Sequence, residues 1–336
     1  MYTFSYHQVM PIFLEFLFPF GQQTYAQDFY FTGFRHEHRL AGLDADLDLP
    51  KLKRSGRSLR MCYSLKSVEK STDRLPWSVR SMAVYHSFDV EYGNALWISV
   101  KGNDLIQDRV MSTTEGITPG SMPFSTKERA FQQALSMHLI NAKWSSEQWR
   151  WYLNALEEEL HAITRPTLSA KVVGRRTENP HIREFLKTRT MSGKLTSKND
   201  PNRSNLFQPP YQGHNPHRSR ARSISQESDV NVDAQDQFSF ADLQILQFLE
   251  EKANEVTFVL KANFDVLREL KLYYQDLMIS DDYIKELSAN HKTAIDHFGK
   301  QIGMITNDLQ MQNSRAETLV RLLVDRKQLV RIHLLN

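Results

Sequence analysis

Histidines and carboxylates are the side chains of this sequence whose spacing comes nearest to a chemical site. His36-Glu37-His38 places three metal-ligating residue types side by side, but a zinc site needs further ligands in a defined geometry, and none is spaced to provide them. Asp44, Asp46 and Asp48 resemble the start of a calcium loop, although the glycine expected at the sixth position and the glutamate expected at the twelfth are missing. We therefore favour polar loops for both segments and assign no metal-binding residue.

Nucleophilic catalysis has no better support. Cys62 is the single cysteine, which excludes an internal disulfide and a multi-cysteine zinc site. It falls on the polar side of a predicted strand, with no histidine nearby in the sequence. His86 shares a strand face with Val84 and Phe88, so a packed, hydrogen-bonded histidine is the simplest interpretation. We predict no catalytic residue, no cofactor-binding residue and no enzyme activity.

The composition is that of an ordinary folded protein. Hydrophobic residues make up 40% and charged residues 24% of 336 residues, which leaves room for one large domain or two smaller ones. No stretch reaches the roughly 20 apolar residues of a membrane-spanning helix. The nearest, 9–20, contains two prolines and a glutamate, so we expect a short buried helix or turn. The side chains expected in the core are Phe13, Leu14, Phe16, Leu17 and Phe18.

Alternating apolar residues predict strands in the first part of the chain, 1–165. The alternation in 59–66 predicts a half-buried strand with its polar residues on the exposed face. Residues 83–102 alternate on both sides of Glu91-Tyr92-Gly93-Asn94, which predicts a hairpin because Gly and Asn tolerate the positive φ of tight turns. The expected fold is an α/β domain with a small mixed sheet and flanking helices.

Two helices are expected after the hairpin. Ser125 and Glu128 form a capping-box pattern ahead of an apolar stripe at helical spacing. Ser145 and Gln148 repeat the pattern, and Pro166 is expected to end the second helix.

The second part, 166–236, is expected to be a basic and largely disordered linker. It has no periodicity and is rich in Ser, Asn, Pro, Arg and Gln, a composition that buries little apolar surface. Residues 171–222 carry twelve basic and three acidic side chains, a net charge of +9. A solvated tether is the first interpretation, attraction to an anionic membrane surface the second and nucleic-acid binding the third. Arg220 lies three residues before Ser223, and Arg222 lies three residues before Ser225. Basophilic kinases recognise this spacing, so both serines are candidate phosphorylation sites.

The third part, 237–336, is expected to form a long helical hairpin or stalk. Ser239 and Asp242 are expected to cap the first helix. Its apolar seam, in 246–277, advances in steps of three and four, and a second such seam runs through 295–330. Ser280-Asp281-Asp282 separates the two, and the acidic side chains there, with Glu286, suit a solvated face. We expect the seams to pack partly together, with a remaining oligomer seam near Leu319, Leu323 and Val330.

Several motifs resemble those of fungal CorA-like proteins. Pro76-Trp77-Ser78-Val79-Arg80, residues 84–90 and residues 97–103 resemble the signature of that family. Residues 16–21 and 33–37 are similar to its N-terminal motif, and residues 318–327 are similar to its stalk helix. The resemblance implies a cytosolic α/β domain, a long stalk helix and two C-terminal membrane helices, assembled as a pentamer around a pore for magnesium and related divalent ions.

The chain departs from that pattern at the pore. Neither membrane helix is present in the sequence, and Gly303-Met304-Ile305 is not the Gly-Met-Asn pore signature, because Ile305 is a seam position. We expect this chain to be the soluble, cytoplasmic-side region of a CorA-like divalent-cation transporter and to form a homo-oligomer. We expect no cofactor other than a regulatory divalent cation such as magnesium. The alternative is a soluble cytoplasmic coiled-coil interaction or scaffold protein without transport. We expect no nucleic-acid partner.

Overall fold

The computed structural model describes residues 2–22, 27–40, 48–72, 75–114, 126–169, 238–279 and 289–335. Among the described residues, two short helices, α1 (Tyr2–Tyr6) and α2 (Phe13–Leu17), come first, and three 3₁₀ turns lie before the second strand. These turns are η1 (Phe18–Phe20), η2 (Gln27–Tyr30) and η4 (Pro50–Leu52). The linker predicted for 166–236 lies outside the described residues apart from the end of one helix, so its disorder stays a prediction.

A four-stranded sheet in the order β1-β2-β3-β4 forms the centre of the first part. Its strands are β1 (Phe34–Arg39), β2 (Ser58–Lys70), β3 (Trp77–Asp89) and β4 (Ala95–Val100). The predicted hairpin is confirmed as β3 and β4, and Gly93 in its turn has φ +72°. Every described pairing is antiparallel, not mixed as expected, because neighbours in sequence are neighbours in the sheet.

Both faces of β2 are buried, which corrects the prediction of a half-buried strand. Its first eleven residues are buried, including the polar Arg60, Ser64 and Lys66. The second face is covered by the N-terminal segment, where Phe13 and Phe16 pack in one cluster with Cys62 and Tyr85. The predicted burial of 9–20 is therefore confirmed for its two central phenylalanines, whereas Phe18 is 66% exposed.

The described helices that follow the sheet in the first part are α3 (Asp104–Thr114), α4 (Lys127–Ser146) and α5 (Trp149–Ser169). The N-cap of α4 is Thr126, whose hydroxyl accepts a hydrogen bond from the Arg129 amide; Ser125 lies outside the described residues. The predicted second capping box is wrong, because Ser145 is still inside α4 and donates to the Ala142 carbonyl. Pro166 does not end α5, since a proline costs a helix one hydrogen bond without always breaking it.

The third part is the predicted helical hairpin, made of α7 (Phe240–Leu277) and α9 (Ala289–Leu335). Ser239 and Asp242 form the predicted capping box on α7. All ten predicted seam residues of α7 are buried, and the two helices lie side by side. At 1.5 Å per residue, the 47-residue α9 is about 70 Å long.

The predicted oligomer seam on α9 is corrected by burial within the single chain. Leu319, Leu323 and Val330 are 2%, 0% and 0% exposed and belong to the main hydrophobic core. One helix cannot bury a heptad seam alone. Here the helices of the same chain that contact α9, mainly α7 and α4, complete the burial. These three side chains are therefore not available to another subunit while the fold is intact.

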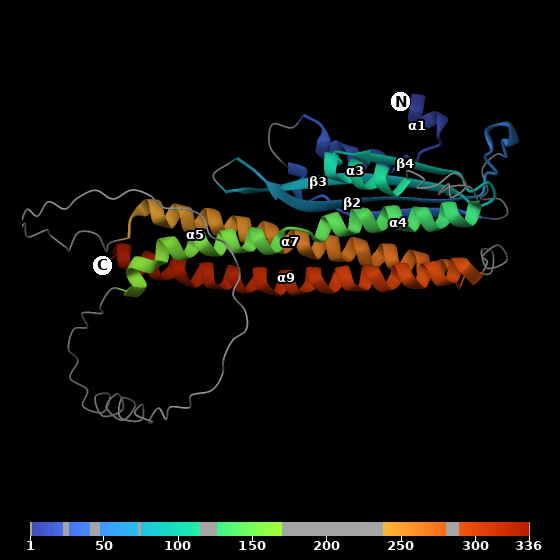
Figure 1. Cartoon of the computed structure of the whole chain (residues 1–336). Helices are drawn as coiled ribbons and strands as arrows, with labels where there is room; N and C mark the ends of the chain where they lie inside the picture. Colours follow the sequence, from blue (N-terminus) through green and yellow to red (C-terminus); the bar gives the residue numbers. More distant parts are fainter. Residues whose placement is uncertain are drawn as a thin grey trace, which may run out of the picture. The chain divides into compact units, whose positions relative to one another are not determined.

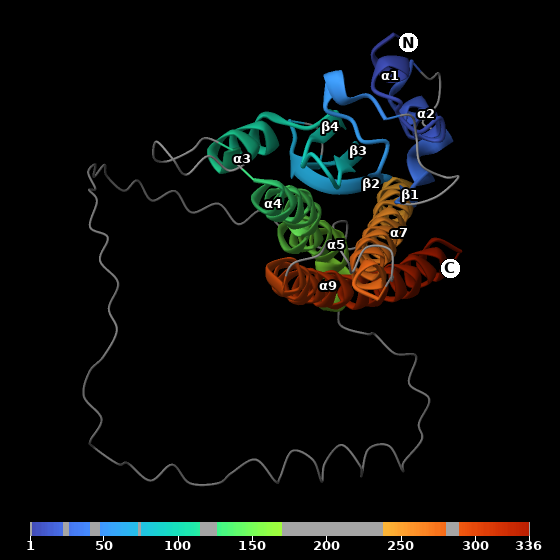
Figure 2. The same ribbon diagram turned by 90° about the vertical axis from the view of Figure 1, so that its right-hand side faces the viewer.

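The hairpin and the first part share one core and form a single compact unit of residues 1–165 and 238–336. Figures 1 and 2 show the sheet lying on α4 and α7, with α9 on the far side of these two helices. The fold class is confirmed as an α/β domain followed by long helices. The parts predicted as separate α/β and stalk domains are joined, however, because α7 packs directly on β2.

Candidate functional site

A buried chain of polar side chains crosses the interface between the sheet and α4. The Asn141 amide donates to the Tyr63 hydroxyl (3.1 Å), which contacts Nδ1 of His138 (2.9 Å). Nε2 of His138 lies 3.3 Å from Nδ1 of His86, and the His86 ring stacks on Trp97 with centroids 4.0 Å apart. Asn141 and His138 come from α4, one turn apart, so a single helix face presents both to β2 and β3.

Burial keeps this chain uncharged. It lowers the pKa of His86 to about 3 and, with the neighbouring His86, holds the pKa of His138 well below its usual range. It also raises the pKa of the Tyr63 hydroxyl. Nε2 of His86 has no hydrogen-bond partner, so the predicted packing of His86 is confirmed but only one of its ring nitrogens is hydrogen-bonded. Neutral, buried groups of this kind position the helix on the sheet.

Acid is expected to destabilise the fold through these imidazoles. Both histidines have a folded-state pKa below the ordinary 6.5, so below pH 6.5 the unfolded chain binds more protons than the folded chain. The stabilisation that the two neutral histidines contribute is therefore fully present above pH 6.5 and is lost as the pH drops from 6.5 towards 3. Between pH 7 and pH 5, His86 alone is expected to remove about 2 kcal/mol of unfolding free energy, with a further loss from His138. Urea denaturation across this pH range measures the change.

The matched variants for the acid effect are His86→Gln and His161→Gln. His161 is exposed on α5, so its replacement is expected to leave the pH dependence unchanged, whereas His86→Gln flattens it. An equal pH slope in both variants would assign the acid sensitivity to other groups.

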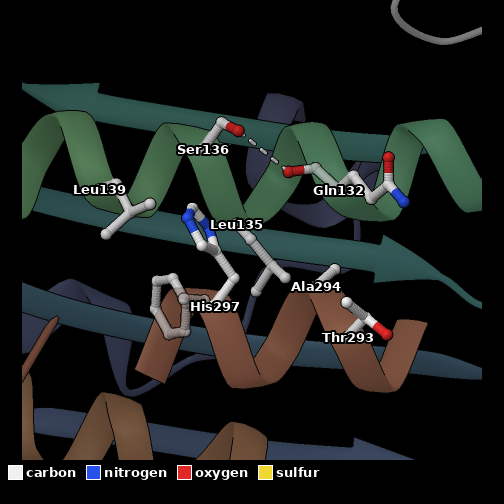
Figure 3. A pocket seen from close by; sticks show the side chains of 8 residues that line it. Gln132, Leu135, Ser136, Leu139, Thr293, Ala294 and His297 are labelled. Carbon is white, nitrogen blue, oxygen red and sulfur yellow. Dashed lines mark hydrogen bonds between the residues drawn. The ribbon is translucent and has the colours of Figure 1, made fainter. Parts of the chain in front are cut away.

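A second feature is a groove of about 380 Å³ between α4 and α9. Figure 3 shows Leu135 and Leu139 of α4 and Ala294 of α9 between the two helices, with Gln132, Ser136, Thr293 and His297 around them. The buried ring of Phe298 also lines the groove and lies 6.4 Å from the His138 ring. An apolar floor with a polar rim suits an apolar side chain, and the groove contains no acid-base pair.

The other residues singled out in the sequence do not converge on a site. The polar loop predicted for His36-Glu37-His38 is wrong, because these residues pair with β2 as part of the edge strand β1. His36 and His38 are exposed there, and the His36 ring packs against Tyr273 of α7 at 4.7 Å. Cys62 is fully buried, and burial raises the pKa of its thiol to about 12, which prevents thiolate chemistry. Among the described residues, no three His, Cys, Asp or Glu side chains are grouped to hold a metal ion.

Several predicted residues lie outside the described part of the chain. They include the phosphorylation candidates Ser223 and Ser225, the calcium-like Asp44 and Asp46, and the carboxylates Asp281, Asp282 and Glu286. Ile305 lies where predicted, buried inside α9, so Gly303-Met304-Ile305 is part of a helix.

The roles of three buried polar residues were not predicted from the sequence. His138 and Asn141 interrupt the apolar stripe of α4, and a buried polar residue on an otherwise apolar face signals a hydrogen-bonded contact. Asn263 was placed in the α7 seam as an ordinary seam residue. In the structure its carboxamide binds the backbone of β2, accepting from the Lys66 amide (3.0 Å) and donating to the Lys66 carbonyl (2.6 Å).

The four-stranded sheet, the helices packed on it and the α7–α9 pair define a helix-backed α/β domain with a long helical hairpin. The family model of CorA-like transporters matches residues 1–168, which is half of the chain, and the protein belongs to this family. No curated protein and no solved structure matches the chain. Within the described residues, every helix is too short or too polar to cross a bilayer.

Proposed function

We propose that this chain is the non-membrane domain of a CorA-like divalent-cation transport system. The match of the CorA-like family model to residues 1–168 carries the proposal. The α7–α9 hairpin supports it, because a helix of about 70 Å can transmit a displacement over a distance that few compact domains span. The proposal assigns magnesium as the ion, the cytoplasmic side of a membrane as the location and a homo-oligomer as the working form, with no catalytic activity of its own.

The assembly proposed here uses a surface other than the buried α9 seam. Met304 and Met311 lie seven residues apart on α9 and are 69% and 61% exposed. Exposed apolar side chains at heptad spacing suit a contact between copies of a helix. Light scattering of the purified chain tests this contact, and Met304→Glu is the variant that would weaken it. A strict monomer at high concentration contradicts the homo-oligomer.

Loss of the gene is the direct test of the transport proposal. Cells that carry the gene are expected to take up magnesium more slowly after its deletion when external magnesium is scarce, and re-expression restores the rate. Normal uptake in the deleted cells would contradict the proposal and favour the coiled-coil interaction protein instead.

The basic segment 166–236 is proposed to be a tether that binds anionic lipid and is released by phosphorylation. Its net charge of +9 in 171–222 supports lipid attraction, at roughly 1 kcal/mol for each basic side chain near the surface. Phosphate on Ser223 and Ser225 would each add about −1.5 to −2 charge. Two phosphates would thus remove about a third or more of the net charge.

The tether proposal predicts a loss of vesicle binding on phosphorylation. A peptide of residues 166–236 is expected to bind vesicles containing phosphatidylserine, and the form phosphorylated at both serines is expected to bind several-fold more weakly. Vesicles of phosphatidylcholine alone are the control. Equal binding of both forms, or binding by neither, would leave the segment as a spacer.

A further inference from the structure

A second cavity among the described residues lies away from the α4–α9 groove. It measures about 580 Å³, is open to solvent on one side, and is lined by η2, the start of β3, α5 and α7. Pockets of 300–1,000 Å³ are the usual size for small-molecule sites. Four elements from distant parts of the chain build its wall, so the cavity exists only in the assembled unit.

Aromatic rings dominate the wall of this cavity. Five rings from four elements line it: Phe29, Tyr30, Trp77, Tyr152 and Phe248. The Tyr30 ring is 55% exposed at the mouth and meets Phe258 edge to face at 4.8 Å. Tyr152 is 2% exposed. Rings of this number offer stacking surface for a flat aromatic molecule.

Among the described residues that line the cavity, the charged groups are two cations and one carboxylate. Lys252 donates to Glu255 one turn further along α7, at 2.8 Å. Arg80 lines the cavity from β3, and its guanidinium is 3.8 Å from Glu69, which lies outside the lining. The described lining residues therefore carry a net charge of +1. Burial and the nearby Glu255 raise the pKa of the Tyr152 hydroxyl, which keeps it neutral.

The position of Lys252 decides which charge a ligand should carry. Its ammonium lies 5.7 Å from the centre of the Phe248 ring, so the chain already places a cation on an aromatic face of the cavity. A second cation would be repelled by Lys252 and would compete for Glu255. An anion would instead pair with Lys252 and Arg80, whose side chains are 30% and 52% exposed and within reach of solvent.

We propose that this cavity binds a flat aromatic molecule that carries an acidic group. The rings of Trp77, Tyr30 and Phe248 hold the aromatic body, and Lys252 with Arg80 holds the carboxylate, sulfonate or phosphate. Glu255 lowers the affinity of the cavity for the acidic ligand, because it competes with the ligand for Lys252. The proposal is independent of cation transport, because none of these residues belongs to a metal-binding group.

Fluorescent probes test the proposal on the full chain. Anilinonaphthalene sulfonate has the proposed chemistry, and phenylnaphthylamine has the same aromatic body without the acid. The sulfonate is expected to bind one site per chain at least tenfold more tightly than the neutral probe. Competition by naphthoate and by naphthyl phosphate then distinguishes a carboxylate from a phosphate as the preferred acid.

Three variants make the test specific. Lys252→Met is expected to weaken the sulfonate about tenfold and the neutral probe hardly at all. Glu255→Gln frees Lys252 and is expected to strengthen sulfonate binding about threefold. Lys261→Met, which removes an exposed cation of the same helix outside the cavity, is the control and should change neither. Circular dichroism establishes that each variant is folded.

Three results would overturn the proposal. Equal affinity for both probes would make the cavity a purely apolar surface. Weaker sulfonate binding in Glu255→Gln would show that the carboxylate does not compete for Lys252. An equal loss in Lys261→Met and Lys252→Met would place the bound probe elsewhere on the chain.

Discussion

Replacing Leu319 by Asp is expected to unfold the whole described unit. Leu319 is 2% exposed in the core that the sheet and the helices share. Removing a buried leucine side chain costs about 2–5 kcal/mol, and burying a carboxyl group without a partner costs several more. The sum is comparable to the stability of about 5–15 kcal/mol of a typical protein. Circular dichroism and urea denaturation would measure the loss.

The pattern of loss separates this result from the one expected of an intersubunit seam. If Leu319 lay between subunits, Leu319→Asp would reduce the oligomer and leave the α/β domain folded. The shared core predicts instead that the sheet and α9 are lost together. Leu329→Asp is the matched control, because Leu329 is a leucine of the same helix and 44% exposed; it should keep the fold. A folded Leu319→Asp monomer would contradict the shared core.

Asn263→Leu is expected to cost roughly 3 kcal/mol of unfolding free energy. The Asn263 carboxamide is 1% exposed and satisfies both main-chain groups of Lys66 on the side of β2 that β1 no longer pairs. It also donates to the Ser145 carbonyl at 3.1 Å. Leucine has a similar volume but no polar atoms, so the Lys66 amide and carbonyl stay buried without the carboxamide, at about 1–3 kcal/mol for each orphaned group. The Ser145 carbonyl still accepts from the Trp149 indole at 2.8 Å.

Hydrogen exchange gives this prediction a local readout. The Lys66 amide should exchange faster in Asn263→Leu than the neighbouring amides that pair with β3. Asn307→Leu makes the same chemical change at an exposed position of α9 and should affect neither stability nor exchange. Unchanged protection of Lys66 in Asn263→Leu would mean that another group replaces the carboxamide.

Local patterns were sufficient to predict the hairpin, the long helices and the capping box. The alternation on both sides of Gly93 predicts β3 and β4 because side chains of a strand alternate between its faces. The steps of three and four in 246–277 predict a helix with one buried stripe because neighbours on a helix face are three or four residues apart. Ser239 and Asp242 predict the start of α7 because their hydrogen bonds span one turn.

The partners of these buried faces were not predictable in the same way. A heptad seam shows that Leu319 and Leu323 are buried, but it does not say whether the chain itself or another subunit covers them. The alternation in β2 indicated one buried face, and the second face is buried only because Phe13 and Phe16 from the N-terminal segment pack over Cys62. Such contacts leave no periodic trace in either segment.

The candidate sites depend on tertiary structure for the same reason. His86 and His138 are 52 residues apart, and Lys66 and Asn263 are 197 residues apart. The sequence by itself determined which segments are strands and helices and which of their faces are apolar, because these properties follow from interactions within a few residues. Only the packing of α4 and α7 on the sheet decided which polar side chains meet, because that choice depends on shape and hydrogen bonding between distant segments.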